Sequence, residues 1–188
     1  MSAETDSYEW IRRSALGFWS KADGARYLAF CMWSMRSGVP IDPSPIGGEV
    51  EGAKSALFWG WLRESSLALE LIIKAALAQK QDYREGHASV PSTHNLPQMW
   101  KMAQLPKTSL QQEDHLRSAH QVLQWSGRYS APRRGSDDLH VNREPLPRSK
   151  CDDRPSAPLS LKMQWESFDT LYQMAQEAYF KEINELAY

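Results

Sequence analysis

The segment from Ala53 to Lys80 constrains the fold of this chain more than any other part of its sequence. It contains no proline, and its one glycine is Gly60. Its apolar residues recur at spacings of three, four and seven positions, which places them on one face of an α-helix. These residues are Phe58, Trp61, Leu62, Leu69, Ile72, Ile73 and Ala76, and the face is widened by Leu57, Leu67, Leu71 and Leu77. A helix with so wide an apolar face is covered on several sides, so we expect it at the centre of the fold.

The rest of the chain also follows helical periodicity, and no segment sustains the alternation that is typical of a β-strand. Further helices are expected over residues 8–36, 96–104, 108–128 and 161–186, and loops over residues 38–48 and 81–97. A chain of 188 residues suits one domain. The sequence therefore predicts a single all-α domain over residues 1–188, an up-and-down bundle of about five helices.

Some of these helices carry more specific signals. The first is expected to break near Asp23 and Gly24, and its apolar side would comprise Trp19, Leu28, Cys31 and Met35. The helix over residues 108–128 begins with a capping box, formed either by Thr108 with Gln111 or by Ser109 with Gln112. Its apolar seam comprises Leu116, Ala119 and Leu123. The last helix has an amphipathic stripe of Trp165, Phe168, Tyr172, Ala175, Tyr179, Ile183 and Leu186.

Charge and cysteine content exclude several kinds of function. The formal net charge is −1, so no overall positive field attracts nucleic acid, and binding would need a local patch. Cys31 and Cys151 lie far apart and match no metal-ligand spacing, so we expect free thiols, no metal and no cofactor. No apolar run is long enough to span a membrane, and the polar start MSAETDSYEW is unlike a signal peptide. We therefore expect a cytoplasmic protein without membrane contact.

Residues 130–160 differ in composition from the rest of the chain. They contain five prolines, six arginine or lysine residues and five aspartate or glutamate residues, with few apolar ones. Such a segment is either disordered or an ordered functional loop. Its basic residues would form a nucleic-acid patch in the second case, whereas its mixed charges suit a solvated linker in the first. The sequence therefore predicts a long polar loop before the last helix.

One narrow polar stripe runs along the predicted central helix. Arg63, Ser66, Glu70 and Lys74 follow one another at helical spacing, so they lie on one side of it. These side chains are either the polar wall of a binding groove or, for Glu70 and Lys74, an ordinary ion pair between successive turns. The stripe therefore marks the part of the helix where a site is expected.

Four motifs resemble, in their order along the chain, the HEPN (higher eukaryotes and prokaryotes nucleotide-binding) domain family. Residues 65–78, SSLALELIIKAALA, resemble the family's second helix, with Glu70 followed four residues later by Lys74. His94-Asn95-Leu96 is similar to a histidine-bearing loop ahead of the family's short helix. The resemblance covers roughly residues 22–132 and the last helix.

The other two motifs lie at the ends of that range. ADGARYL, residues 22–28, is similar to the middle of the family's first helix. Arg128 and Tyr129, shortly before Pro132, resemble the end of its fourth helix. The resemblance implies a helical up-and-down bundle that forms a homodimer and binds RNA or a nucleotide. Arg128 and Tyr129 would then bind phosphate and stack a base, and the alternative is an ion pair of Arg128 with Glu70 and a packed Tyr129.

Many members of the family are metal-independent endoribonucleases that use an arginine and a histidine separated by four to six residues. The histidine transfers a proton and the arginine stabilises charge on the phosphate. No histidine follows Arg128 at that spacing, and the nearest match is Arg134 with His140 in the polar loop. That pair is either a displaced catalytic pair or a chance match among many arginines.

The residues and the resemblance together lead to one main hypothesis and two alternatives. The main hypothesis is a HEPN-like homodimeric module of a prokaryotic defence or toxin-type system that binds RNA or a nucleotide. Its binding residues would be Arg63, Glu70, Lys74, His94, Arg128 and Tyr129. For His94 the alternative is a capping role beside Thr93 or Asn95. The alternative functions are an endoribonuclease that uses Arg134 and His140, and a non-catalytic assembly or antitoxin-paired subunit with a partner protein encoded nearby.

Overall fold

The computed structural model describes residues 14–38, 50–85, 90–126 and 163–186. They form five α-helices and one short π-helical turn, and no strand occurs in these ranges. The helices are α2 (Ala15–Gly38), α3 (Val50–Glu85), α4 (Leu96–Met102), α5 (Leu110–Gln121) and α7 (Trp165–Leu186), and the π-helical turn is η2 (Val122–Ser126). The prediction of an all-α bundle of about five helices is confirmed.

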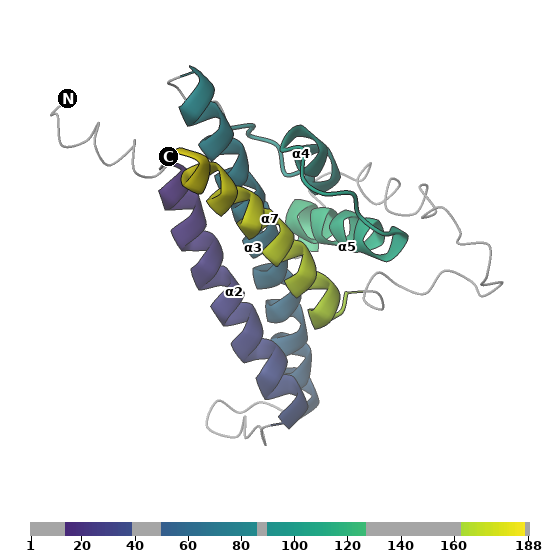
Figure 1. The fold of residues 1–188 in the computed structure, drawn as a ribbon. Helices are drawn as coiled ribbons and strands as arrows, with labels where there is room; N and C mark the ends of the chain where they lie inside the picture. The colour runs from purple at the N-terminus through teal and green to yellow at the C-terminus, as the bar shows by residue number, and fades with distance from the viewer. Residues whose placement is uncertain (1–13, 39–49, 86–89, 127–162, 187–188) are drawn as a thin grey trace, which may run out of the picture.

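Helix α3 is the centre of the bundle and contacts every other described helix. Figure 1 shows α2 and α7 running along α3, while α4 and α5 lie on the side of α3 away from α2. Its apolar face is buried as expected, with Trp61, Leu69, Ile72 and Ile73 fully inaccessible to solvent. Burial of each such side chain stabilises the fold by about 1.5–3 kcal/mol, so α3 supplies much of the core energy.

Helix α2 differs from its prediction in two respects. It runs without a break through Asp23 and Gly24. Its fully buried residues are small, namely Ala15, Ala22, Ala25 and Ala29, and Met32 and Trp33 pack beside them against α3. Leu28 and Met35, which were expected on the inner side, are exposed instead. The alanines allow close approach on the inner side, and Leu28 and Met35 lie on the outer side.

The ends of α3 extend beyond the predicted range. It begins at Val50 and continues to Glu85, so residues 81–85 are helical where a loop was expected. The one glycine within its central part lies against α2. A Cβ atom at Gly60 would lie 2.7 Å from Sδ of Met32, so the end of that methionine side chain would have to shift if Gly60 were replaced.

Hydrogen bonds from side chains and backbone fix both ends of helix α4. Asn95 caps α4 by accepting a hydrogen bond from the Gln98 amide at 3.1 Å, with a proline in the first turn. After α4, Gln104 adopts a φ of 51°, and its amide donates to the Lys101 carbonyl. Leu105 donates to the Trp100 carbonyl, which completes a Schellman motif.

Helix α5 begins with the second of the two predicted capping boxes. The Ser109 hydroxyl accepts from the Gln112 amide, and the Gln112 side chain accepts from the Ser109 amide. The predicted seam of Leu116, Ala119 and Leu123 is buried. The predicted helix over residues 108–128 is shorter, because α5 ends at Gln121 and continues as η2.

Helix α7 closes the bundle with the stripe that the sequence predicted. Phe168, Tyr172, Ala175 and Tyr179 are buried, and Trp165 is half-buried. The guanidinium of Arg26 on α2 donates to Asp169 on α7 and lies 4.7 Å from the centre of the Tyr172 ring, which ties α2 to α7. Residues 39–49 and the predicted 130–160 loop lie outside the described residues. Among the helices described, none combines the length and the apolar character that crossing a membrane requires.

Candidate functional site

A buried ion pair on α3 is the foundation of the candidate site. Glu70 and Lys74 are both buried, and Lys74 Nζ donates to Glu70 Oε1 at 2.7 Å. Exposed ion pairs of this spacing contribute only about 0.2–0.5 kcal/mol to a helix. A buried pair must also offset the loss of hydration, so each charge depends strongly on its partner. The position of this pair in the core therefore sets it apart from a surface pair.

His94 joins this pair from the loop that precedes α4. Its Nδ1 lies 2.9 Å from Oε1 of Glu70. The loop is fixed locally, since the Asn95 amide donates to Thr93 Oγ1 and the Asn95 side chain caps α4. Capping is thus performed by Asn95, which leaves the His94 ring to face α3. One carboxylate oxygen accepts from both Lys74 and His94.

His120, on α5, extends the cluster further. Its Nδ1 lies 2.8 Å from the backbone carbonyl oxygen of His94. Burial lowers the pKa of His120, the hydrogen bond to the His94 carbonyl raises it, the His94 ring lowers it, and Glu70 raises it. These effects show that the two rings and the carboxylate lie close enough to influence one another's charge. We call Glu70, Lys74, His94 and His120 the junction site, because it lies where α3, α4 and α5 meet.

The hydrogen bonds determine which ring nitrogen of each histidine carries a proton. A carbonyl oxygen only accepts, so Nδ1 of His120 must be the donor. Oε1 of Glu70 accepts from the Lys74 ammonium, so we assign Nδ1 of His94 as a second donor to the same oxygen. In the neutral rings, both Nε2 atoms then have a free lone pair. Neither Nε2 has a hydrogen-bond partner among the described residues. The junction site thus presents two imidazoles that can bind or exchange protons through Nε2.

The second oxygen of Glu70 has a different environment. Oε2 is buried and receives no hydrogen bond within the described part of the chain. All the hydrogen bonding that holds this carboxylate therefore passes through Oε1. Ser66, the neighbouring residue of the predicted stripe, is buried and donates to the Leu62 carbonyl instead. No group of three or more histidine, cysteine, aspartate or glutamate side chains in the described ranges is arranged to hold a metal ion.

Similarity to known proteins adds nothing to this geometry. No protein-family model matches the sequence, and no match was found among curated proteins or solved structures.

The structure brings together three of the predicted binding residues, namely Glu70, Lys74 and His94. It separates Arg63 from them, since this side chain is exposed and its Nε lies 3.8 Å from Glu64 on the surface. The other predicted residues, Arg128 and Tyr129 for binding and Arg134 and His140 for catalysis, lie outside the described residues.

His120 is the member of the junction site that the sequence did not identify. It lies beside the apolar seam of α5, and no sequence spacing relates it to His94 or Glu70. Its role depends on the packing of α5 against the loop before α4. A half-buried histidine next to a helix seam is a weak signal, so only the tertiary structure reveals the pairing.

Proposed function

We propose that this chain is a HEPN-like helical module that binds RNA or a nucleotide, and that a phosphate group is received at the junction site. The observation that carries the proposal is the pair of imidazoles, His94 and His120, whose Nδ1 atoms are both occupied and whose Nε2 atoms are not. Arg128 and Tyr129 remain part of the proposed binding surface. The homodimer and the prokaryotic defence or toxin-type system follow from the resemblance in sequence.

Charge balance at the junction site favours an anionic ligand. The positive charge of Lys74 is balanced by Glu70, so the neutral rings leave the cluster without net charge. Protonation of either ring creates a local cation, and a phosphate placed nearby stabilises that charged form. Charge-assisted N–H···O hydrogen bonds to phosphate are about twice as strong as neutral ones. A chain with a net charge of −1 can bind a polyanion locally in this way.

RNA binding tests this proposal directly. We expect His94→Ala and His120→Ala each to weaken binding of a labelled single-stranded RNA at least about tenfold in fluorescence anisotropy, since each loses a charge-assisted bond. Lys21→Ala is the matched control, because it removes a positive charge from α2 and should change affinity little. Circular dichroism would confirm that each variant is folded.

Two results would contradict the proposal. One is unchanged RNA affinity in both histidine variants. The other is the absence of any increase in melting temperature with RNA or with nucleotides, since a ligand that binds only the folded state must raise it. The second result would favour the assembly or antitoxin-paired subunit, whose partner is a protein encoded nearby.

An endoribonuclease is the second candidate, and the Glu70–His94 pair is what favours it. A carboxylate that orients a histidine is a common arrangement for a general base. His94 Nε2 would take the proton of a ribose 2′-hydroxyl while its oxygen attacks the phosphorus. Protonated His120 would give its proton to the departing 5′-oxygen, which leaves a 2′,3′-cyclic phosphate and a 5′-hydroxyl. This assignment differs from the Arg134–His140 pair that the sequence suggests.

Cleavage in EDTA distinguishes these assignments. Activity lost in His94→Ala and retained in His140→Ala would support the junction site, and the reverse would support the sequence pair. RNA that is bound and left intact would exclude the endoribonuclease and retain the binding module.

A further inference from the structure

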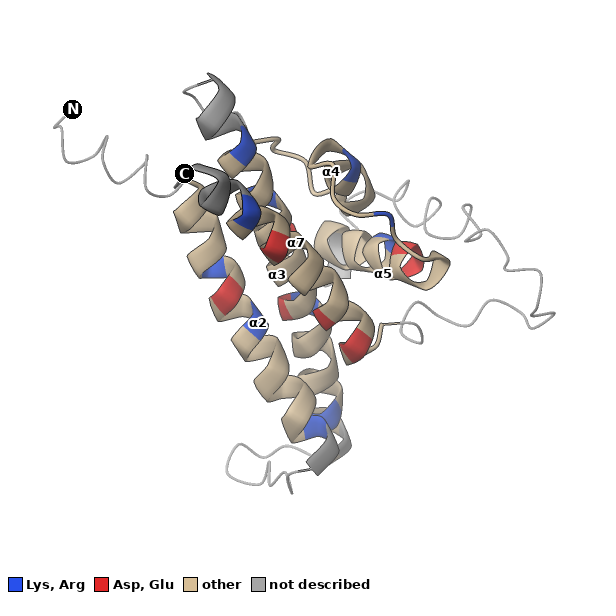
Figure 2. Cartoon of the chain, in the orientation of Figure 1, with Lys and Arg blue, Asp and Glu red and all other residues tan. Residues whose placement is uncertain are grey.

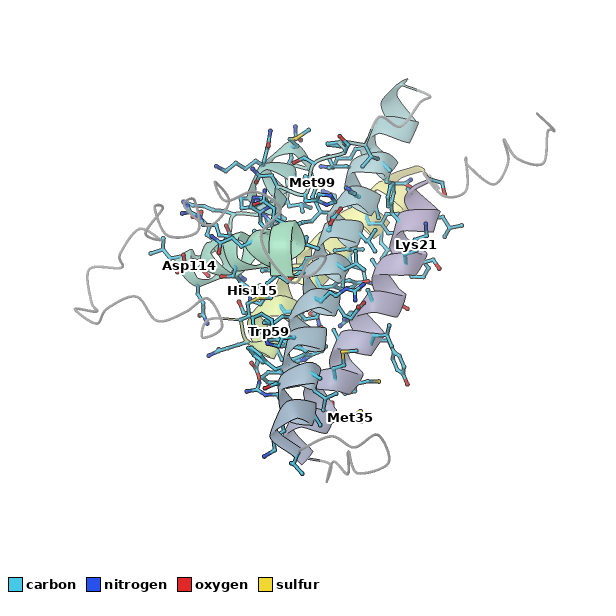
Figure 3. The ribbon with its side chains drawn as sticks, turned by 180° about the vertical axis from the view of Figure 1, so that it is seen from behind. Lys21, Met35, Trp59, Met99, Asp114 and His115 are labelled. Atoms are coloured by element: carbon cyan, nitrogen blue, oxygen red, sulfur yellow. The ribbon has the colours of Figure 1, made fainter. Side chains whose placement is uncertain are left out.

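The outer side of α2 carries an unusual set of exposed apolar residues. Relative exposures are 62% for Leu16, 68% for Tyr27, 49% for Leu28, 49% for Phe30 and 42% for Met35. We call these five residues the α2 outer face. Figures 1 and 3 show α2 at one edge of the molecule, with α3 and α7 on its inner side. Only Lys21, Asp23, Arg26 and Arg36 are charged in the whole helix, as Figure 2 shows.

Apolar residues lie on both the inner and the outer side of α2. Four alanines are buried in the core and Phe18, Trp19, Met32 and Trp33 pack against it, while the five residues of the outer face are exposed. A helix that is apolar on all sides is normally buried on all sides. Arg26 is turned inward to Asp169 on α7, so it contributes no charge to the outer side. The α2 outer face therefore has the character of a buried surface.

The size of this face matches half of a dimer interface. Two aromatic and three aliphatic side chains at these exposures present apolar surface on the order of 500 Å². A standard interface buries about 800 Å² per partner, of which about 60% is apolar, and this also amounts to roughly 500 Å². The largest apolar patch on a typical monomer is of similar size, about 300–600 Å², and is often functional.

We propose that the α2 outer face binds the α2 outer face of a second copy of this chain, with the two helices parallel about a twofold axis. Two charges at its edges favour a copy over an unrelated protein. Lys21 lies two turns before Leu28 and follows one edge, whereas Asp23 lies two turns from both Leu16 and Phe30 and follows the other. In a parallel pair, opposite edges meet at the same height, so each Lys21 approaches the partner's Asp23.

Gly24 lies within the same face, one turn before Tyr27 and Leu28. A Cβ atom there would meet nothing within 4 Å, so the surface is open at this point. Replacement of Gly24 by a larger residue is therefore compatible with the fold of a single copy and fills space that a partner helix would occupy. Substitution of Gly24 therefore tests the stability of the pair while leaving the stability of one copy unchanged.

The dimer deepens the homodimer part of the proposed function, and its test uses no RNA, so the two can fail separately. Light scattering at micromolar concentration should give about twice the chain mass of 21.5 kDa. Tyr27→Asp with Leu28→Asp should reduce this to one chain mass, and Gly24→Leu should weaken the dimer at least tenfold without lowering the melting temperature. Leu110→Asp is the control, because Leu110 is 79% exposed on α5.

The native thiol of Cys31 tests the parallel arrangement. Cys31 is half-buried, and it lies one turn after Tyr27 and Leu28, near the middle of the face. In a parallel pair the two Cys31 thiols meet across the axis, so diamide should link them in a Cys151→Ser variant. An antiparallel pair places Cys31 far from its copy. A wild-type mass of one chain would overturn the dimer, and a dimer without this cross-link would overturn the parallel arrangement.

Discussion

At the scale of single residues, the polar side chains in the core differ in whether they have partners. Glu70 and Lys74 bond to each other, and His94 bonds to the same carboxylate oxygen. His115 on α5 is fully buried, and neither of its ring nitrogens has a hydrogen-bond partner among the described residues. Its ring lies against Phe168, with centroids 6.5 Å apart. Substitution of His115 should therefore raise the stability of the fold, whereas substitution of Glu70 or Lys74 alone should lower it.

The pH dependence of stability should reflect His115. Burial lowers its pKa from 6.5 to about 4 in the folded state. Below pH 6.5 the unfolded chain binds a proton that the folded chain does not, so stability is lost as the pH falls from 6.5 towards 4. The loss amounts to about 3 kcal/mol. Urea unfolding at pH 7.0, 5.5 and 4.5 would measure it.

The control for this prediction is substitution of the ring itself. His115→Phe and His115→Leu should remove most of this acid sensitivity, because neither residue titrates. Both should also raise stability at pH 7, since they relieve two buried nitrogens without partners. An acid-induced loss of the same size in these variants would assign it to other groups.

Glu70 and Lys74 should show strong energetic coupling. Glu70→Gln leaves the Lys74 charge buried without its partner and should cost about 3–5 kcal/mol of unfolding free energy, and Lys74→Met should cost a similar amount. The double variant removes both charges and should recover most of the loss. A double-mutant cycle from urea unfolding measures this coupling. Additive losses would show that the pair is not coupled.

At the scale of elements, helix ends were fixed by short local signals. The sequence offered two capping boxes for α5, and the structure uses Ser109 with Gln112. Both signals involve residues within one turn of each other, so no tertiary contact is needed to form them. The inner face of α2 is different, because its prediction from large apolar residues was wrong for Leu28 and Met35. Close packing of two helices through alanine is decided by the neighbouring helix.

The two capping options make a matched test. Ser109→Ala removes the acceptor for the Gln112 amide and should cost about 1 kcal/mol of unfolding free energy. Thr108→Ala, one residue earlier, should cost less than about 0.5 kcal/mol, as for a surface substitution away from a structural feature. Thermal unfolding of both variants provides the comparison. Equal losses would indicate that both hydroxyl groups contribute to the start of the helix.

At the scale of the whole molecule, α2 lies on one side of α3, and α4 and α5, which form the junction site with α3, lie on the other (Figure 1). In the proposed dimer each copy would therefore keep a complete junction site away from the interface. The alternative is a site that two copies build together. The two arrangements differ in whether a single copy can bind RNA.

A monomeric variant distinguishes these arrangements. Tyr27→Asp with Leu28→Asp should retain RNA affinity per chain within about threefold, because both residues lie on α2 and the junction site lies where α3, α4 and α5 meet. Adding His94→Ala to this variant should remove binding, which shows that the same site is responsible. Fluorescence anisotropy on the monomer fraction gives both values. Loss of affinity in the monomer alone would favour a composite site.

The sequence by itself determined the fold class, the central helix and the helix caps. Each depends on periodicity or on neighbours within a turn, as in the apolar face of α3 from Trp61 to Ile73. It also marked Glu70, Lys74 and His94, since two lie on one helix side and the third precedes a capped helix. Only the tertiary structure decided that His120 joins them, that Arg63 does not, and that Leu28 and Met35 of α2 lie on the outer side. These outcomes depend on how helices pack across the bundle, and packing relates residues that no sequence spacing connects.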